Sequence, residues 1–193
     1  IEQSLENGKS KKPLLIVPKN KQTDWKDEYN LLFPDRNVII VDNMSKWDGK
    51  ADNGTVIIAS YTALNNLWYS DDAFYNLERT ISSINHNRQA IDRYKGDKAR
   101  EKAKEKQDNE NAKILGGAEK GNSKKHLVDK IGIDLLCVDE VHNFNKVFEN
   151  VYSQTENNEF SGLLEAKSSA RAVKLYNLAQ HILSNNNSEN VYL

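Results

Sequence analysis

Four short apolar runs constrain the fold more than any other feature of this sequence. Each is rich in aliphatic side chains and lacks the polar alternation of a strand with one face in solvent. Such runs predict strands buried on both faces, as in a parallel sheet. Helical stretches separate them, so the sequence predicts an α/β fold with parallel strands and right-handed crossovers. The runs are Leu14–Val17, Val38–Val41, Thr55–Ala59 and Leu135–Val138, and a further run begins at Val191.

Three stretches with helical features accompany these runs. Residues 1–10 resemble the last turns of a helix, with Gly8 as its C-terminal stop. Residues 25–33 and 165–183 each place apolar side chains on one helical stripe. The first stripe contains Trp25, Tyr29, Leu32 and Phe33, and the second contains Ala172, Leu175, Ala179 and Ile182.

The segment 71–130 differs from the rest and is interpreted as a charged helical insertion between two core strands. Its first part spaces apolar residues as an amphipathic helix or a coiled-coil arm would. The following stretch, KGDKAREKAKEKQDNENAK, has almost nothing to bury, so it predicts a solvated helix or a disordered segment. The arm is a candidate for binding a protein partner or, through the basic run 98–106, for clamping DNA. The apolar positions are Phe74, Leu77, Ile81, Ile84, Ile91 and Tyr94.

The composition excludes several kinds of protein. The single cysteine, Cys137, rules out an internal disulfide and any cysteine-based zinc site, and its apolar surroundings predict burial. This usage fits a reducing, cytosolic setting. No stretch reaches the roughly 18 to 20 apolar residues of a membrane span, so no membrane partner is expected. The net charge of −1 does not indicate a nucleic-acid-binding surface, so any such surface must be local.

The sequence LLCVDEVHNF, residues 135–144, carries the clearest chemical pattern. An apolar strand ends at Asp139 and Glu140, and His142 follows. In open parallel sheets ligands bind at the carboxyl ends of strands, where one carboxylate can hold Mg²⁺ and another can activate water. The alternative is that a strand has simply reached the surface, where acids meet solvent.

Three motifs in order resemble those of superfamily 2 helicases and Snf-type remodelling ATPases. DEVH, residues 139–142, is similar to the DEAH-type motif II, with Val141 in place of the usual alanine. LLIVPKNKQTDWKDEYNLLFP, residues 14–34, resembles motif Ia and its helix, and VIIASYTAL, residues 56–64, resembles motif Ib. With VDEVHNFNK and SSARAVKLYNLAQHIL, the chain looks closest to the helicase modules of bacterial and phage proteins that join a helicase to an adenine DNA methylase.

The resemblance implies the first RecA-like lobe of a nucleic-acid-dependent ATPase, a DNA helicase or translocase of the bacterial cytoplasm. It implies that Asp139 organises Mg²⁺, that Glu140 activates the hydrolytic water, and that His142 couples the nucleotide site to the second lobe or to nucleic acid. It also implies backbone contacts with DNA, in preference to RNA, at two strand ends. Those contacts involve Pro18, Lys19, Asn20, Ser60, Tyr61 and Thr62.

Each of these roles has an alternative. The residues at the two strand ends can serve as ordinary turns and helix caps, since Ser and Thr are common N-caps. His142 can be a surface histidine beside a turn. A metal site built on His142 and nearby acids is a further alternative, although His86, His126 and His181 lack ligand spacing around it.

The chain departs from the family in two respects. It contains no G-x-x-x-x-G-K-[ST] phosphate loop and no Ser/Thr-Ala-Thr of motif III. We therefore expect a piece of the first lobe of a longer helicase, in which ATP and Mg²⁺ bind only in the intact parent and the isolated piece is inactive. The alternative is a non-catalytic nucleic-acid-binding or scaffold module with the same fold.

Overall fold

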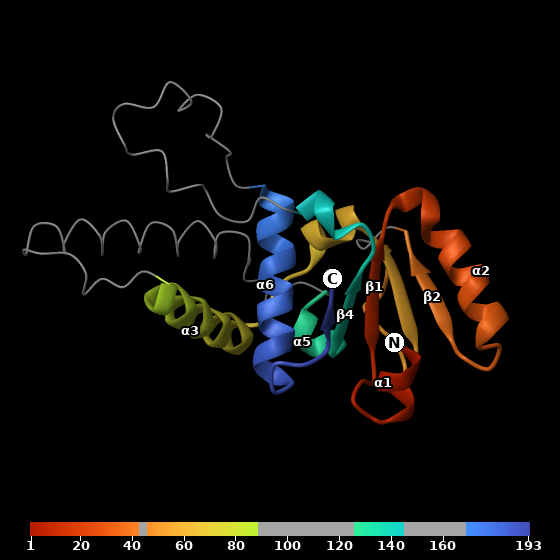
Figure 1. The fold of residues 1–193 in the computed structure, drawn as a ribbon, viewed down its shortest axis with the longest axis horizontal. Coiled ribbons are helices and arrows are strands. Elements are labelled where there is room, and N and C mark those ends of the chain that lie inside the picture. Colours follow the sequence, from red (N-terminus) through yellow and green to blue (C-terminus); the bar gives the residue numbers. More distant parts are fainter. Residues whose placement is uncertain (43–45, 89–125, 145–168) are drawn as a thin grey trace, which may run out of the picture.

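The computed structural model describes residues 1–42, 46–88, 126–144 and 169–193, without the side chains of 82–88 (Figure 1). Within this part, five parallel strands form one sheet in the order β2-β3-β1-β4-β5. The predicted α/β fold with a parallel sheet is confirmed in these general terms. The strands are β1 Pro13–Val17, β2 Val38–Val41, β3 Val56–Ser60, β4 Leu135–Val138 and β5 Val191–Tyr192.

The register of the sheet aligns the carboxyl ends of its central strands. Ile16 of β1 pairs with Ala59 of β3 on one side and with Val138 of β4 on the other. Strands β1 and β3 are buried along their whole length, as the apolar runs predict. The central strands therefore form a rigid base that delivers the residues following them to one edge.

Two burial predictions were wrong in part. In β2, Ile39 and Ile40 are only half-buried, because β2 is an edge strand with a neighbour on one side. In β4, Cys137 is half-buried, although burial still raises the pKa of its thiol. Burial thus favours the protonated thiol, which is the less nucleophilic form.

Helices cover both faces of the sheet (Figure 1). Helices α1 and α2 pack on the face that carries Leu15 and Val17, while α3, α5, α6 and the short 3-10 helix η2 pack on the face that carries Leu14 and Ile16. This alternation follows from the two-residue period of a strand. The elements are α1 Glu2–Glu6, η1 Lys19–Lys21, α2 Gln22–Leu32, η2 Tyr61–Asn66, α3 Asp71–Arg88, α5 Val128–Ile131, η4 Val141–Phe144 and α6 Ala170–Asn185.

The stripe predicted on α2 is correct except at its end. Trp25, Tyr29 and Phe33 pack toward the sheet, and the rings of Tyr29 and Phe33 lie 5.1 Å apart. Leu32, assigned to the same stripe, is 64% exposed. The helix ends at Leu32, and the chain turns so that Phe33 takes the last packing position.

Both ends of the segment interpreted as an insertion pack into the body of the domain. Leu77 and Ile81 of α3 are buried in the main core, and α3 packs against α6. At the other end, Leu127 forms a bridge with Trp68, so the chain re-enters beside the point where it left. Ile91, Tyr94 and the basic run 98–106 lie outside the described residues.

Helix α6 buries the predicted stripe completely, since Ala172, Leu175, Ala179 and Ile182 all lie in the core. It begins at Ala170, later than predicted, because Ser169 has an extended backbone. Residues 165–168 lie outside the described part. At the start of the chain, helix α1 ends at Glu6, and Gly8 adopts a positive φ of 67°, in keeping with its expected role as a stop.

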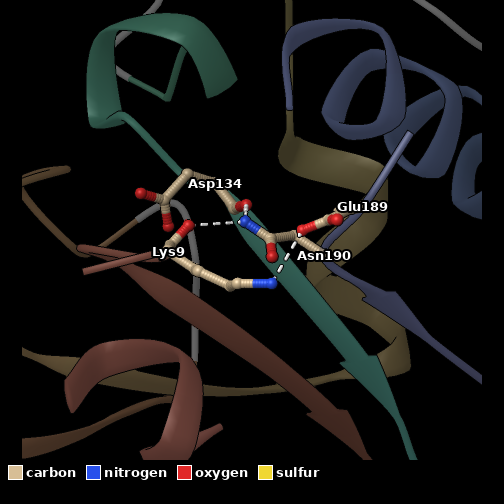
Figure 2. A network of polar contacts seen from close by, with 4 residues as sticks. All are labelled: Lys9, Asp134, Glu189 and Asn190. Carbon is tan, nitrogen blue, oxygen red and sulfur yellow. Dashed lines mark hydrogen bonds and ion pairs between the residues drawn. The ribbon is translucent and has the colours of Figure 1, made fainter. Parts of the chain in front are cut away.

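A polar network fastens the amino ends of β1, β4 and β5 (Figure 2). The Asp134 carboxylate accepts hydrogen bonds from the Ser10 hydroxyl at 2.6 Å and from the backbone N–H groups of Lys11 at 2.7 Å and Lys12 at 3.0 Å. The Asn190 amide donates to the carbonyls of Lys9 at 2.7 Å and Asp134 at 3.1 Å. These contacts connect the segments that enter the three strands at this edge of the sheet.

Candidate functional site

The fold places a crevice between the carboxyl ends of β1 and β4. From β1 the chain continues into α2 on one face of the sheet. After β4, the described elements η4 and α6 both pack on the other face (Figure 1). Adjacent parallel strands whose connections go to opposite faces create a crevice, which is the usual ligand site of open α/β sheets.

A cavity of about 610 Å³ occupies this crevice. Its volume lies within the range of roughly 300 to 1,000 Å³ typical of small-molecule sites. The α2 side contributes Pro18, Asn20, Lys21, Asp24, Trp25 and Glu28, and the β4 side contributes Asp139, Glu140 and Asn143. The two predicted acids thus face residues that come from the end of β1.

Three hydrogen bonds fix Asp139 at the centre of the site. Its backbone N–H donates to the Ile16 carbonyl at 2.9 Å, which continues the pairing of β4 with β1. Its carboxylate Oδ2 accepts the indole N–H of Trp25 at 3.1 Å. Its carbonyl accepts the hydroxyl of Tyr61 at 2.8 Å. The other carboxylate oxygen, Oδ1, accepts no hydrogen bond from the described chain.

Glu140 turns the chain sharply away from the sheet. Its φ of 57° lies in the left-handed region, which is unusual for a residue with a side chain. Its carbonyl accepts the backbone N–H of Asn143 at 3.1 Å and the Asn143 side-chain amide at 3.0 Å. The side chain pairs with His142 Nδ1 at 3.1 Å, with the side chains of Glu140 52% and of His142 72% exposed.

The cavity is predominantly acidic. Four of the side chains that line it are carboxylic acids: Asp24, Glu28, Asp139 and Glu140. The one lysine that lines it, Lys21, donates to Asp24 at 2.9 Å. The pKa of Lys21 is raised, first by this hydrogen bond and then by the negative charges of Asp24 and Asp139. Such a lining attracts cations and repels free phosphate, so a phosphate would approach only together with a metal ion.

Tyr61 joins the end of β3 to the acidic turn. Its ring packs edge-on against Phe144 with centroids 5.0 Å apart, and the Arg171 guanidinium lies 5.9 Å from the ring centroid. Burial raises the pKa of its hydroxyl, and the nearby charges of Asp139 and Glu140 add to this. The hydroxyl therefore stays protonated and can keep donating to the Asp139 carbonyl.

The residues expected to contact nucleic acid occupy different environments. Lys19 and Asn20 are exposed, and Asn20 lines the cavity together with half-buried Pro18. Ser60 is 2% exposed, and its hydroxyl lies 2.8 Å from that of exposed Thr62. The structure thus brings Pro18 and Asn20 beside the acids, whereas Lys19, Ser60 and Thr62 do not line the cavity.

Buried Gln22 joins the ends of β2, β3 and α2. With its amide oriented to satisfy both neighbours, it donates to Asp42 Oδ1 at 3.2 Å and accepts the backbone N–H of Ser60 at 3.2 Å. The two expected contact segments are therefore linked to each other at this edge of the sheet.

Sequence reasoning missed five residues of the site. Four of them follow β1 and recur at helical spacing, which puts them on one stripe of α2 and its preceding turn. Trp25 was assigned only to the packing stripe. The stripe's position after a buried strand was a usable signal, whereas Asn143 had none beyond its nearness to the acids. The missed residues are Lys21, Asp24, Trp25, Glu28 and Asn143.

Within the described residues, no three His, Cys, Asp or Glu side chains gather as a ready-made metal site. His126 and His181 are buried away from the acids, with His126 bonded to the Trp47 carbonyl at 2.7 Å. A histidine-based metal site around His142 gains no support from this part of the chain. None of the helices searched in the described part is long and apolar enough to cross a membrane.

Neither a family model, nor a curated protein, nor a solved structure matches the chain.

Proposed function

We propose that this chain forms part of a nucleic-acid-dependent ATPase, a helicase or translocase, and that its cavity is the Mg²⁺ side of the ATP site. The observation that carries the proposal is the position of Asp139 and Glu140, which follow a central parallel strand and line the cavity between β1 and β4. The resemblance of DEVH to motif II supports the same assignment, and the resemblance to bacterial and phage helicase-methylase proteins supports a location in the bacterial cytoplasm.

The donor set fits Mg²⁺. Carboxylate oxygens are the ligands that Mg²⁺ prefers, usually one or two together with retained water. Asp139 meets this requirement, because its Oδ2 is engaged by Trp25 and its Oδ1 has no donor in the described chain. When bound, Mg²⁺ neutralises charge on the phosphates of ATP.

The lining does not by itself hold phosphate, because acids predominate and Lys21 is engaged by Asp24. The proposal therefore assigns the phosphate-binding loop to residues outside this sequence, in a longer parent protein. In this chain, Asp139 would hold the cation. Glu140, which is exposed beside the cavity, would accept the proton of the attacking water.

The test is ATP hydrolysis by the parent protein with Mg²⁺, measured with and without DNA. Glu140→Gln should reduce turnover by roughly 100-fold or more, the usual contribution of general-base catalysis, while ATP binding persists. Glu28→Gln is the matched control, since it removes the same charge from the opposite wall of the cavity. Undiminished turnover in the Glu140→Gln protein would refute the proposal.

A second candidate is a non-catalytic nucleic-acid-binding or scaffold module. It is favoured by exposed Lys19 and Asn20 at the ligand-binding edge, and by the lack of a phosphate loop in these 193 residues. Fluorescence anisotropy with labelled DNA and RNA at several salt concentrations tests it. Lys19→Ala should reduce the slope of log affinity against log salt by about one. Binding with that slope change, without ATP turnover in the parent, would favour this candidate.

A further inference from the structure

We infer that Trp25 and Tyr61 are positioning residues for Asp139 and together orient its carboxylate for the cation. The inference rests on the proposed function, because it concerns how the Mg²⁺ ligand is held. It assigns to Tyr61 a role inside the protein, in addition to or in place of a contact with nucleic acid.

The contact made by Trp25 carries the first part. Its half-buried ring packs against the core cluster beneath α2, and Nε1, the only polar atom of the side chain, donates to Asp139 Oδ2 at 3.1 Å beside the cavity. The two residues lie 114 positions apart in the sequence and on opposite walls of the cavity. An indole N–H can only donate, so it suits an ionised carboxylate oxygen and leaves the second oxygen for a metal ion.

The contact made by Tyr61 carries the second part. Its hydroxyl donates to the Asp139 carbonyl at 2.8 Å, while Phe144 fixes the ring edge-on. With the Asp139 N–H bonded to Ile16, both backbone polar groups of the acid are engaged by different strands or their ends. Tyr61 thus limits rotation of the peptide that precedes the strained turn at Glu140.

These contacts have the character of the outer groups that orient metal ligands. Hydrogen bonds to a ligating carboxylate set its rotamer, and their loss typically costs about 10- to 100-fold in metal affinity or activity. The short chain of Asp139 makes only one such side-chain bond within the described residues, so the loss of Trp25 Nε1–H has no substitute there.

The experiment uses Mn²⁺ alone as a paramagnetic probe of the Asp139 carboxylate, titrated into the 193-residue protein at concentrations high enough to detect weak binding, because the nucleotide-bound metal is expected only in the intact parent. The readout is the broadening of the backbone amide NMR signals of residues 139–143. Trp25→Phe and Tyr61→Phe retain an aromatic ring and remove one donor each, so each should require roughly tenfold more Mn²⁺ for the same broadening. Asp139→Asn should abolish the specific broadening.

Two matched controls remove the same groups elsewhere. Trp47→Phe deletes an indole N–H that donates to the Lys50 carbonyl at 3.2 Å, and Tyr29→Phe deletes a hydroxyl that donates to Glu2 at 2.9 Å. Both should bind Mn²⁺ as the unsubstituted protein does. A general loosening of the fold would affect the controls as well, so their behaviour separates positioning from stability.

The outcomes distinguish the inference from the function on which it rests. If Asp139→Asn loses the broadening but the Trp25→Phe and Tyr61→Phe proteins do not differ from the unsubstituted protein, the positioning roles are refuted and the metal role stands. If Asp139→Asn behaves as the unsubstituted protein, the metal role falls, and the inference falls with it. A second readout needs no substitution at Trp25: its indole proton resonance should shift in Asp139→Asn, and an unmoved resonance would also refute the contact.

Discussion

Replacing Asp134 by alanine should destabilise the domain more than its half-exposed position directly before β4 indicates. The carboxylate receives three hydrogen bonds, from Ser10 and from the backbone N–H groups of Lys11 and Lys12, at 2.6 to 3.0 Å. These bonds fasten the segment that enters β1 to the residue that enters β4. Their loss removes the carboxylate acceptor of two backbone N–H groups at the amino end of the central strands.

The magnitude follows from these contacts. A hydrogen bond to a charged group contributes about 1.5 to 3 kcal/mol when buried, and less where water can replace it. Ser10 is 3% exposed, so its bond should count nearly in full, whereas Lys11 is exposed and its N–H can bond to water. We expect a loss of about 2 to 4 kcal/mol, or a decrease in Tm of roughly 4 to 16 °C for a domain of this size.

The assay is urea unfolding followed by circular dichroism, with Glu189→Gln as the control. Glu189 belongs to the same network, but it forms a solvent-exposed ion pair with Lys9 (Figure 2). The Lys9 Nζ and Glu189 Oε2 atoms lie 3.2 Å apart, and both side chains are more than half exposed. An exposed pair of this kind contributes between about 0 and 1 kcal/mol. If Asp134→Ala costs no more than Glu189→Gln, the network does not stabilise the sheet and the reasoning fails.

Two further predictions concern the packing of α3 and α6. Ile81→Ala should cost about 2 to 5 kcal/mol in urea unfolding, because the side chain is fully buried, whereas Tyr75→Ala on the exposed face of α3 should cost little; equal costs would mean that α3 does not pack on the core. Burial lowers the pKa of His181 below its ordinary value, an effect that the charge of Asp129 opposes. The unfolded chain therefore binds more protons, so the free energy of unfolding should fall as pH decreases through about 6.5 and level off below the folded-state pKa. His181→Phe should flatten this dependence and exposed His142→Gln should not, a comparison that urea midpoints at pH 7 and 5 would provide.

The sequence predicted the sheet because burial on both faces leaves a local mark, an apolar run without alternation. It did not predict which strand lies at the edge. Ile39 and Ile40 belong to a run as apolar as that of β3, but their exposure depends on strand order, which is set by crossovers far along the chain. Leu32 was misplaced for a related reason, since helical periodicity does not specify where a helix ends.

The candidate site, like the fold, was predicted only in part. Asp139 and Glu140 were predicted because adjacent carboxylates after an apolar strand form a local pattern. The partners of Asp139 were not, because Trp25 lies 114 residues away and Tyr61 lies 78 residues away. Both are aromatic residues whose large apolar rings already explain why they are packed. The sequence pattern therefore gives no signal that the indole N–H of Trp25 or the hydroxyl of Tyr61 also has a polar role.

The environments of the two acids bear on why a buried strand should end in a pair of carboxylates. An acid that only meets solvent has no need of a donor from another element, and Glu140, exposed and paired with His142, is compatible with that simple role. Asp139 is not, because it is half-buried, bonded through its side chain to α2 and through its carbonyl to η2, and lines a cavity with one carboxylate oxygen that accepts no hydrogen bond from the described residues. Asp134 shows that bonds from other elements can stabilise the sheet alone, so the feature that sets Asp139 apart is the cavity that it lines. The case for function at this edge therefore depends first on Asp139, and Glu140 gains a catalytic role only if a cation held by Asp139 brings a substrate beside it.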